Sequence, residues 1–403
     1  MNTFNFTAKI VPIKDTEKFH PVEKKSFSSG WENITVKFNC LSETNRVMVM
    51  AQGGRWTDEK KNGVIKTFSK TMTDENGNVI KGEKIEVPYN KRFDEDQIAS
   101  VAAFRRYEIN TGDTKMRYKL QDAISAFEND SITDEMIVAT GCNTIDEAKA
   151  ALEKLNKKRK IFITEYDFCE YLTKLLAQSE KFKDKLFYIS GTYDVQYSAE
   201  KNRFYRNYHV NRITLASDDA TPSTEMKIDF YFDENSWDDS SFEETGKVIV
   251  NGWGNYYDSN IKSNGFFDMP IVVREENEKK RNALKRKLTC EDGIKQIGLT
   301  LNVIEGAEVV ELTMDMLDDE TREDIEMGLL DWETVKKELG GRAVGDKVSE
   351  LRFAELTPKK NVAQDTIYTV DDMVPAKEKV EDEDEDDDSV PFSLDDDDDS
   401  DDL

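Results

Sequence analysis

The chain has 403 residues, of which 37% are hydrophobic, 34% charged and 10% aromatic. This length is enough for two or three domains with sizeable cores, and the aromatic content excludes a chain that is disordered throughout. The net charge of −27 is concentrated at one end, since residues 381–403 hold 15 acids and no base. The other 380 residues carry 68 acids against 56 bases, a charge of −12, so we treat the acidic terminus as a separate electrostatic unit.

Several classes of protein are not expected from this sequence. No apolar run approaches the ~20 residues of a membrane span, and residues 1–14 lack the continuous apolar run of a secretory signal. The cysteines are far apart and form no Cys-x-x-Cys pair, so we predict neither a zinc site nor a disulfide framework. Isolated thiols fit a reducing environment, which predicts a cytoplasmic protein.

Catalytic motifs are also missing from the sequence. It contains two histidines, His20 and His209, and no phosphate-binding loop, nucleophile elbow or His-Glu-x-x-His motif. We therefore predict no catalytic residue, no metal and no cofactor. A metal-dependent nuclease built from Asp and Glu alone stays open, because such sites are assembled in space rather than in sequence.

Residues 1–93 are predicted to form an N-terminal β domain. Apolar residues alternate with polar ones over 4–10 and again over 34–40, which is the period of a half-buried strand. The turn at 42–45 would join the second of these to a strand at 46–50. A second hairpin is predicted around the Asn-Gly dipeptide of 75–78.

Residues 94–183 are predicted to be helical. Apolar residues recur at helical spacing over 97–107, 117–127, 144–158 and 164–182. The third of these helices would begin with a capping box formed by Thr144 and Glu147.

Residues 184–274 return to a β pattern and are predicted to form an OB-like barrel. We expect about five strands here, with a bulge or sharp bend at Gly191, because a glycine inside a strand usually marks one. Five strands with an early bend fit a small closed Greek-key barrel of the OB type. Residues 275–357 would form an α+β segment packed on the barrel, and 358–403 a disordered linker and acidic tail.

The predicted fold class is therefore a β-rich α+β protein. It has one or more OB-type β-barrels elaborated with helices, plus a disordered acidic C-terminal tail. The sequence shows no strict internal repeat, although a second barrel of similar plan is compatible with the strand pattern.

The stretch 181–212 combines aromatic and basic residues in an otherwise acidic chain. It holds eight aromatics and seven bases against three acids. Aromatic faces stack on unpaired bases and cations follow the phosphates, so this composition is typical of a single-stranded nucleic-acid groove. Phe187, Tyr193 and Tyr197 share the parity of the core. The candidate binding residues are therefore Tyr188, Lys201, Arg203, Tyr205, Arg206, Tyr208 and Arg212, with ordinary surface as the alternative.

A second candidate surface lies in the N-terminal β domain. Trp31 opens a strand, Lys37 alternates with apolar neighbours, and Arg55 and Trp56 follow a pair of glycines. Two tryptophans beside bases would extend the same groove. The alternative interpretation is that both tryptophans fill the core or a sheet edge.

The acidic terminus contains an apolar island, Val390-Pro-Phe392, after a run of aspartates. The stretch from Asp386, Asp387 and Asp388 to Pro391 and Phe392 resembles the acidic tip of bacterial single-stranded DNA-binding proteins. In that family an aspartate run ends in Pro-Phe and recruits replication and repair proteins. The resemblance implies that these five residues bind such partners.

The resemblance has limits. In the bacterial family the phenylalanine is the last residue, whereas eleven residues follow Phe392 here. The bacterial proteins are also much shorter, so the long body with such a tail looks more like a large bacteriophage replication protein. The resemblance covers roughly the last twenty residues, and the barrel is supported at the level of pattern only.

Together these features predict a non-catalytic protein that binds and protects single-stranded DNA during replication or recombination. Its acidic tail would modulate DNA binding and recruit replication proteins. One alternative is an acidic protein-binding protein, such as a chaperone for basic proteins or a DNA mimic. The other is a phage virion or scaffold component without nucleic-acid binding.

Overall fold

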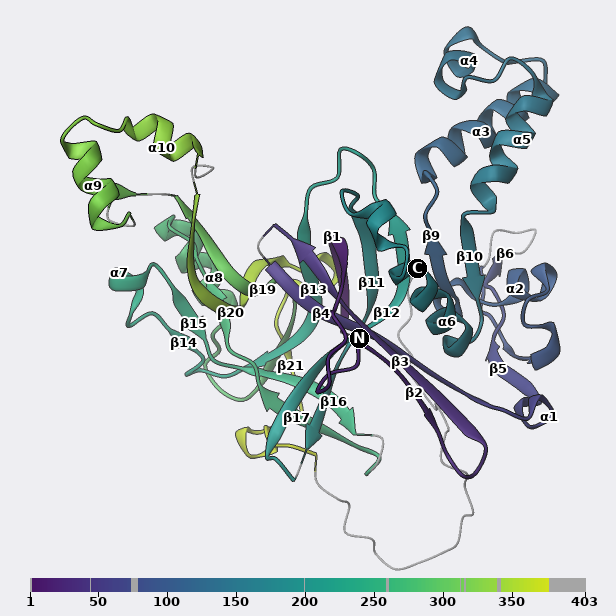
Figure 1. The fold of residues 1–403 in the computed structure, drawn as a ribbon. Helices are drawn as coiled ribbons and strands as arrows, with labels where there is room; N and C mark the ends of the chain where they lie inside the picture. The colour runs from purple at the N-terminus through teal and green to yellow at the C-terminus, as the bar shows by residue number, and fades with distance from the viewer. Residues whose placement is uncertain are drawn as a thin grey trace, which may run out of the picture.

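The computed structural model describes residues 2–43, 45–73, 79–198, 200–258, 261–311, 313–314, 317–338 and 342–376. The protein is β-rich, with a large mixed sheet to which helices are added at several places (Figure 1). Within these ranges no helix is both long and apolar enough to span a membrane.

Five strands from two distant parts of the chain form a closed ring, which we name ring A. They are β1 (Thr3–Pro12), β3 (Trp31–Ser42), β4 (Asn45–Trp56), β11 (Phe187–Ser198) and β12 (Arg203–Leu215). β1 pairs antiparallel with β3 and with β11, β3 with β4, and β11 with β12. The ring closes where β4 meets β12 in parallel, at Met50 and His209. β2 (Val22–Ser26) pairs with residues 32–36 of β3, the part that β1 leaves unpaired.

The ring A strands form because alternate side chains bury an apolar face. Phe6, Ile34, Phe38 and Ile189 are all fully buried in the main core. Helix α6 (Glu165–Leu176) packs against β3 and β4, and it begins at Thr164, whose hydroxyl accepts a hydrogen bond from the Asp167 N–H at 3.3 Å. Its apolar side chains join the same core.

A long insertion separates β4 from α6. It contains α1 (Glu59–Asn62), β5 (Val64–Phe68), β6 (Met72–Thr73), β7 (Val79–Ile80), β8 (Lys84–Pro88), η1 (Tyr89–Lys91), α2 (Glu95–Ser100), η2 (Ala103–Arg105), β9 (Tyr107–Asn110), α3 (Thr114–Glu128), α4 (Asp134–Thr140), α5 (Ile145–Asn156) and β10 (Arg159–Phe162). β9 pairs with β10 and joins β12 in parallel. Between them, α3 to α5 form a projecting unit with a small core of its own around Leu120, Cys142 and Ala148 (Figure 1). η3 (Ser179–Phe182) follows α6.

The rest of the chain forms a second ring, which we name ring B. Its strands are β13 (Ser223–Phe232), β15 (Val248–Val250) continued by β16 (Trp253–Asp258), β17 (Ser263–Asp268) continued by β18 (Ile271–Val273), β19 (Lys295–Glu311) and β20 (Arg342–Leu356). β15 and β16 pair with β18 and β17 in one unbroken register. β13 pairs with β16 and β19, β19 with β20, and β18 with β20 in parallel. The remaining elements are β14 (Trp237–Asp238), α7 (Phe242–Thr245), α8 (Glu278–Lys287), α9 (Asp319–Glu326), α10 (Trp332–Glu338), η5 (Pro358–Lys360), β21 (Gln364–Asp365) and η6 (Val370–Asp372).

The two rings share one plan. In both, the spatial order is first, second, third, fifth and fourth strand, and the third and fifth meet in parallel at a single residue pair. In both, a helix stands between the third and fourth strands of the chain: α6 in ring A and α8 in ring B. The rings are joined through β1 and β13, and through a bridge between Asn45 and Gly306. This internal duplication has no counterpart in a sequence repeat.

Several sequence predictions are confirmed and others are corrected. α5 begins after Thr144 as predicted, and the pairing of β11 with β12 shifts register at Gly191. The barrel predicted within 184–274 does not form there, because β11 and β12 pair with β1 and β4 while β13 to β18 need β19 and β20. The helix predicted over 97–107 is the shorter α2 followed by η2, and α4 was not predicted. The turn at 75–78 lies outside the described residues, although β6 and β7 on either side of it pair.

Candidate nucleic-acid interface

The outward side of the β3–β4 hairpin is a continuous, partly exposed surface. Residues directly opposite each other in this hairpin share a face, while their sequence neighbours point into the core. We name this surface the β3–β4 outer face. It comprises Trp31, Asn33, Thr35, Lys37, Asn39 and Leu41 of β3, and Arg46, Met48, Met50, Gln52, Gly54 and Trp56 of β4.

One end of this face carries a tryptophan pair. Trp31 and Trp56 are direct cross-strand partners, with ring centroids 5.2 Å apart at an angle of 77°. Trp31 lies against Gly54, where a Cβ atom would come within 2.1 Å of its indole, so only glycine leaves room for this ring. The Asn62 side chain makes two hydrogen bonds to the Trp56 backbone: its Oδ1 accepts from the Trp56 N–H and its Nδ2 donates to the Trp56 carbonyl, each at 2.9 Å. The two indoles are therefore positioned before any ligand arrives.

Cationic and flexible apolar side chains follow the tryptophans along the face. The Lys61 Nζ lies 5.3 Å from the Trp56 ring centroid, and the Lys37 Nζ lies 5.4 Å from that of Phe19. Met48 is 49% exposed, although methionine at an exposed strand position gains nothing from the core. Arg46 is exposed near the far end of the hairpin. This combination can stack on bases and attract phosphates.

The face continues onto the end of β12. β4 and β12 run in parallel through the Met50–His209 bridge, so Tyr205, four residues before His209, lies toward the same end of the ring as Arg46, four residues before Met50; beside Arg46, β4 also pairs with β19 at Asn45. Tyr205 is 37% exposed, with the guanidinium carbon of Arg203 5.5 Å and the Lys201 Nζ 6.0 Å from its ring centroid. From residue 56 to residue 46, strand geometry gives a track of about 33 Å.

Tyr208 is a correction to the predicted groove. It is only 6% exposed and packs edge-on against Phe4 at 5.5 Å and beside Tyr193 at 5.3 Å between ring centroids. An odd spacing places Tyr208 on the opposite side of β12 from Tyr205, so the two cannot both face outward. Arg206 shares the side of Tyr208 and is exposed only because it lies near the strand end.

Tyr188 and Arg212 also lie apart from the β3–β4 outer face. Tyr188 is 37% exposed on β11, with its hydroxyl 3.4 Å from that of Ser217. Arg212 stands where β12 has left β4 and pairs with β9, and its Nε lies 3.8 Å from a Glu108 carboxylate oxygen. Neither residue is brought together with the tryptophans.

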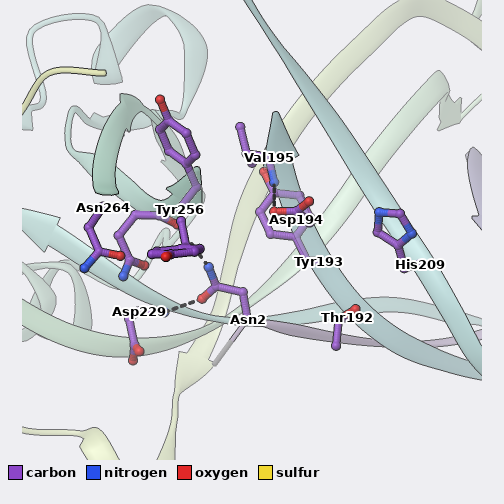
Figure 2. Close-up of a pocket in the computed structure, with 11 residues that line it drawn as sticks. Asn2, Thr192, Tyr193, Asp194, Val195, His209, Asp229, Tyr256 and Asn264 are labelled. Atoms are coloured by element: carbon purple, nitrogen blue, oxygen red, sulfur yellow. Dashed lines mark hydrogen bonds between the residues drawn. The ribbon is translucent and has the colours of Figure 1, made fainter. Parts of the chain in front are cut away.

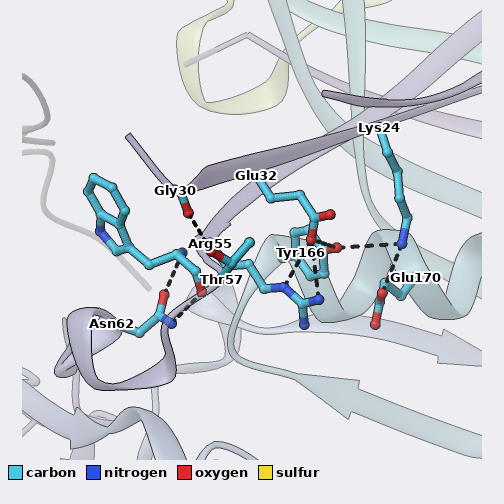
Figure 3. A network of polar contacts seen from close by, with 9 residues as sticks. Lys24, Gly30, Glu32, Arg55, Thr57, Asn62, Tyr166 and Glu170 are labelled. Carbon is cyan, nitrogen blue, oxygen red and sulfur yellow. Dashed lines mark hydrogen bonds and ion pairs between the residues drawn. The ribbon is translucent and has the colours of Figure 1, made fainter. Parts of the chain in front are cut away.

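Arg55 points away from the surface on which it was predicted. Its guanidinium lies over the Tyr166 ring at 4.1 Å and donates to Glu32 at 3.2 Å, as Figure 3 shows. Tyr166 also donates its hydroxyl to Glu32, and Lys24 pairs with Glu170 at 3.1 Å. Arg55 therefore ties α6 to the hairpin, and we assign it a structural role.

This network makes a pH-dependent contribution to stability. The hydrogen bond from Tyr166, with the nearby Arg55, holds the pKa of Glu32 below its usual value. A lowered folded-state pKa stabilises the protein above the unfolded value, near 4.3, and this stabilisation is lost as pH falls through the folded pKa. We expect Glu32→Gln to lower the free energy of unfolding by about 1–2 kcal/mol at pH 7. Urea denaturation should show this difference shrinking below about pH 4; a constant difference between pH 3 and 7 would contradict the assignment.

A pocket of about 450 Å³ lies between the two rings (Figure 2). Asn2 bridges it, donating to the Asn255 carbonyl at 3.4 Å and accepting from the Asp229 N–H at 3.2 Å. Burial raises the pKa of Asp194 in its wall and lowers that of His209. Two carboxylates in the wall, Asp194 and Asp229, make this pocket unfavourable for phosphates, so we do not extend the track into it.

Sequence reasoning missed part of the β3–β4 outer face. Asn33, Thr35, Asn39, Leu41, Arg46, Met48, Met50 and Gln52 of this face were not predicted, nor was Lys61, which lies beside it on α1. The signal was available, because a hairpin turn at 42–45 already sets Trp31 opposite Trp56. The predicted partner-binding residues Asp386 to Asp388, Pro391 and Phe392 lie outside the described residues.

Comparison with known proteins gives little further information. No family model and no curated protein matches the chain. Among solved structures, the chain is similar to a deletion mutant of the single-stranded DNA binding protein from Thermus aquaticus, with 6% identity and a TM-score of 0.26 over 79% of this chain and 98% of that chain. A TM-score this low carries neither fold nor function to this chain.

Proposed function

We propose that both rings are OB-type barrels and that the protein binds single-stranded DNA on the β3–β4 outer face, without catalysis. An OB barrel is a five-stranded Greek-key barrel that binds oligonucleotides on its second and third strands and on the loop between its fourth and fifth. In ring A those strands are β3 and β4, and that loop leads into Arg203 and Tyr205.

The observation that carries the proposal is the tryptophan pair at the end of a basic track. Trp31 and Trp56 lie half-buried on the outside of the ring, next to Lys61, and tryptophans that leave part of their indole at the surface are enriched at binding interfaces. A track of about 33 Å with aromatics at both ends suits the roughly 4–16 nucleotides that one OB fold binds. The overall negative charge does not oppose this, because affinity depends on the local field.

The first experiment is a gel shift with labelled oligo-dT and with duplex DNA of the same length. We expect tight binding to oligo-dT and weak binding to duplex, because stacking needs unpaired bases. An unlabelled RNA competitor in the same assay shows whether the protein prefers DNA or RNA. No shift with any nucleic acid would favour the protein-binding or virion alternatives.

Salt dependence tests the basic side chains separately. The track carries Lys37, Arg46, Lys61, Lys201 and Arg203. If each meets a phosphate, the slope of log K against log salt should be about −3.5 for a single strand. Replacing Lys37 and Arg46 with Gln should reduce that slope by about 1.4. Fluorescence anisotropy between 50 and 300 mM salt measures it, and a flat response would mean that these bases are ordinary surface.

We also propose a role for the acidic tail in replication or recombination. Its 15 acids in residues 381–403 would compete with DNA for the track, since tethering gives an effective concentration near the millimolar range. The Pro391–Phe392 group would supply an apolar anchor for replication proteins, with Asp386 to Asp388 facing basic residues of the partner. Deleting 379–403 should tighten oligo-dT binding at low salt, whereas Phe392→Ala should reduce partner binding only.

A further inference from the structure

Ring B has an outward aromatic cluster at the place that corresponds to the β3–β4 outer face. Trp253 belongs to its second strand and Phe266 to its third, and both have the outward parity. Tyr231 of the neighbouring β13 lies beside them, with its ring centroid 5.1 Å from that of Phe266. By position and chemistry these three side chains repeat the aromatic character of the face on ring A.

Unlike the face of ring A, this cluster is covered, and the cover is the C-terminal end of the described chain. Residues 364–376 cross ring B beside β16 and β17, at the yellow end of the colour scale (Figure 1). As a result Tyr231 and Phe266 are 5% and 4% exposed, together with Met373 of the crossing segment at 7%. We name residues 364–376 the strap.

Contacts at its two ends and at the aromatic cluster hold the strap, and at its start β21 pairs with β19. The Thr366 N–H donates to the Ile294 carbonyl at 3.2 Å, the Phe266 N–H to the Val374 carbonyl at 2.8 Å, and the Ala376 N–H to the Tyr256 hydroxyl at 3.0 Å. Its outward side chains gain nothing from ring B: Ile367 is 92% and Val370 57% exposed. The strap is therefore attached at its ends and at one cluster rather than along its length.

The groups that the strap places on ring B are those that a single strand would bring. Tyr368 stands edge-on against Phe266 at 4.9 Å and Tyr231 at 6.2 Å, where a nucleobase could contact the same rings. The Asp365 carboxylate pairs with Lys295, which lies opposite the buried Phe232 and so on the other side of the sheet from Phe266; this pair fastens the start of the strap and is not part of the covered cluster. Asp371 and Asp372 add further negative charge to the exposed side.

We propose that ring B carries a second single-stranded DNA-binding face, formed by Tyr231, Trp253 and Phe266, and that the strap masks it. Release of the strap opens this face, so the protein has a state with one open ring and a state with two. The proposal rests on the function proposed for ring A, and it adds a site and its regulation.

The substitution Gly265→Ala, which adds a single methyl group under the strap, tests whether the strap covers a binding face. A Cβ atom at Gly265 would lie 2.2 Å from the backbone nitrogen of Ala376 and 2.8 Å from its Cα. Gly265 is outside the left-handed region, so alanine is compatible with its own backbone, and the three atoms nearest to the added Cβ all belong to Ala376 of the strap. In Gly265→Ala we expect faster proteolysis within 364–376, a larger number of nucleotides bound per chain, and oligo-dT affinity raised ~5-fold or more, the gain from at least one added stack.

Controls assign the gain to ring B. Ser263→Ala, two residues earlier in β17, adds no atom against the strap and should leave affinity and site size as they are. Adding Trp253→Ala to Gly265→Ala should cancel the gain. If the strap of Gly265→Ala is released but affinity and site size do not change, the second face is refuted.

Truncation gives an independent result if the methyl group does not release the strap. A chain ending at Ala363 lacks the strap, whereas one ending at Ala376 keeps it, and neither has the residues that follow. Equal site size and affinity for these two chains overturn the proposal. If replacing the ring A tryptophans weakens oligo-dT binding while these two truncated chains bind equally, only the proposal of a second face on ring B is refuted. If neither change affects binding, the proposed function fails as well.

Discussion

The double variant Trp31→Ala, Trp56→Ala should lose most single-strand affinity while staying folded. Each lost base–aromatic stack is worth about 1–3 kcal/mol, so the pair should cost about 2–6 kcal/mol, or between roughly 30-fold and 10⁴-fold in affinity. The fold should persist because both indole side chains lie on the outer side of the hairpin. Its inner side is fixed by fully buried residues such as Ile34 and Phe38. Anisotropy with labelled oligo-dT measures the loss, and circular dichroism confirms folding.

Tyr118→Ala is the matched control for this loss. Tyr118 is an aromatic on α3 that is 56% exposed, and the Arg117 guanidinium carbon lies 5.2 Å from its ring centroid. It therefore offers similar chemistry on a surface to which we assign no DNA. Normal binding by the folded tryptophan variant, or an equal loss in Tyr118→Ala, would refute the assignment of the β3–β4 outer face.

The second large effect concerns stability rather than binding. Tyr208→Ala should destabilise the protein by about 3–5 kcal/mol, the usual cost of removing a large buried aromatic side chain. Its ring packs with Phe4 and Phe6 at 5.5 Å each, where β1 meets β11 and β12. Tyr205→Ala, three residues earlier, should change stability by less than about 1 kcal/mol and should weaken oligo-dT binding by about 1–3 kcal/mol.

Thermal and urea unfolding of the two tyrosine variants separate core from surface. The opposite pattern, with a stable Tyr208→Ala that binds poorly, would restore Tyr208 to the groove and contradict the packing described here. The comparison is informative because both tyrosines belong to one strand and to one predicted cluster.

Local periodicity was sufficient to predict which side of most strands is buried. The alternation over 34–40 identifies Ile34, Val36, Phe38 and Cys40 as core, and all four are fully buried. Capping chemistry likewise predicted the start of α5 at Thr144. These features depend on neighbours within a few residues, which a single sequence shows directly.

The closure of the rings could not be predicted in this way. Met50 and His209 meet across more than 150 positions in the chain, with the whole α-helical insertion between them. The alternation of apolar and polar residues in β11 does not indicate whether its neighbour in the sheet is β1 or a strand close to it in the sequence. The sequence therefore predicts that all strands of one barrel lie within 184–274, whereas the first three strands of ring A lie before residue 57.

The candidate site was only partly predictable for a related reason. Trp31, Lys37 and Trp56 are on the β3–β4 outer face, but Arg55 is turned inward because adjacent residues of a strand point to opposite sides. Tyr205 and Tyr208 differ in the same way. Counting aromatics and bases in a window selects a region of the chain, whereas the parity of each residue in its strand decides which side chains of that region can reach a ligand.

The central claim, that single-stranded DNA lies on the β3–β4 outer face, is tested most directly by ultraviolet crosslinking of the full chain to oligo-dT. Mass spectrometry of the crosslinked peptides identifies the residues in contact with the bases. We expect crosslinks in 31–39 and 46–56, with a further site at 203–205, and loss of the first two in the Trp31→Ala, Trp56→Ala variant. Crosslinks confined to α3 to α5 or to α9 and α10, with none on β3 or β4, would contradict it.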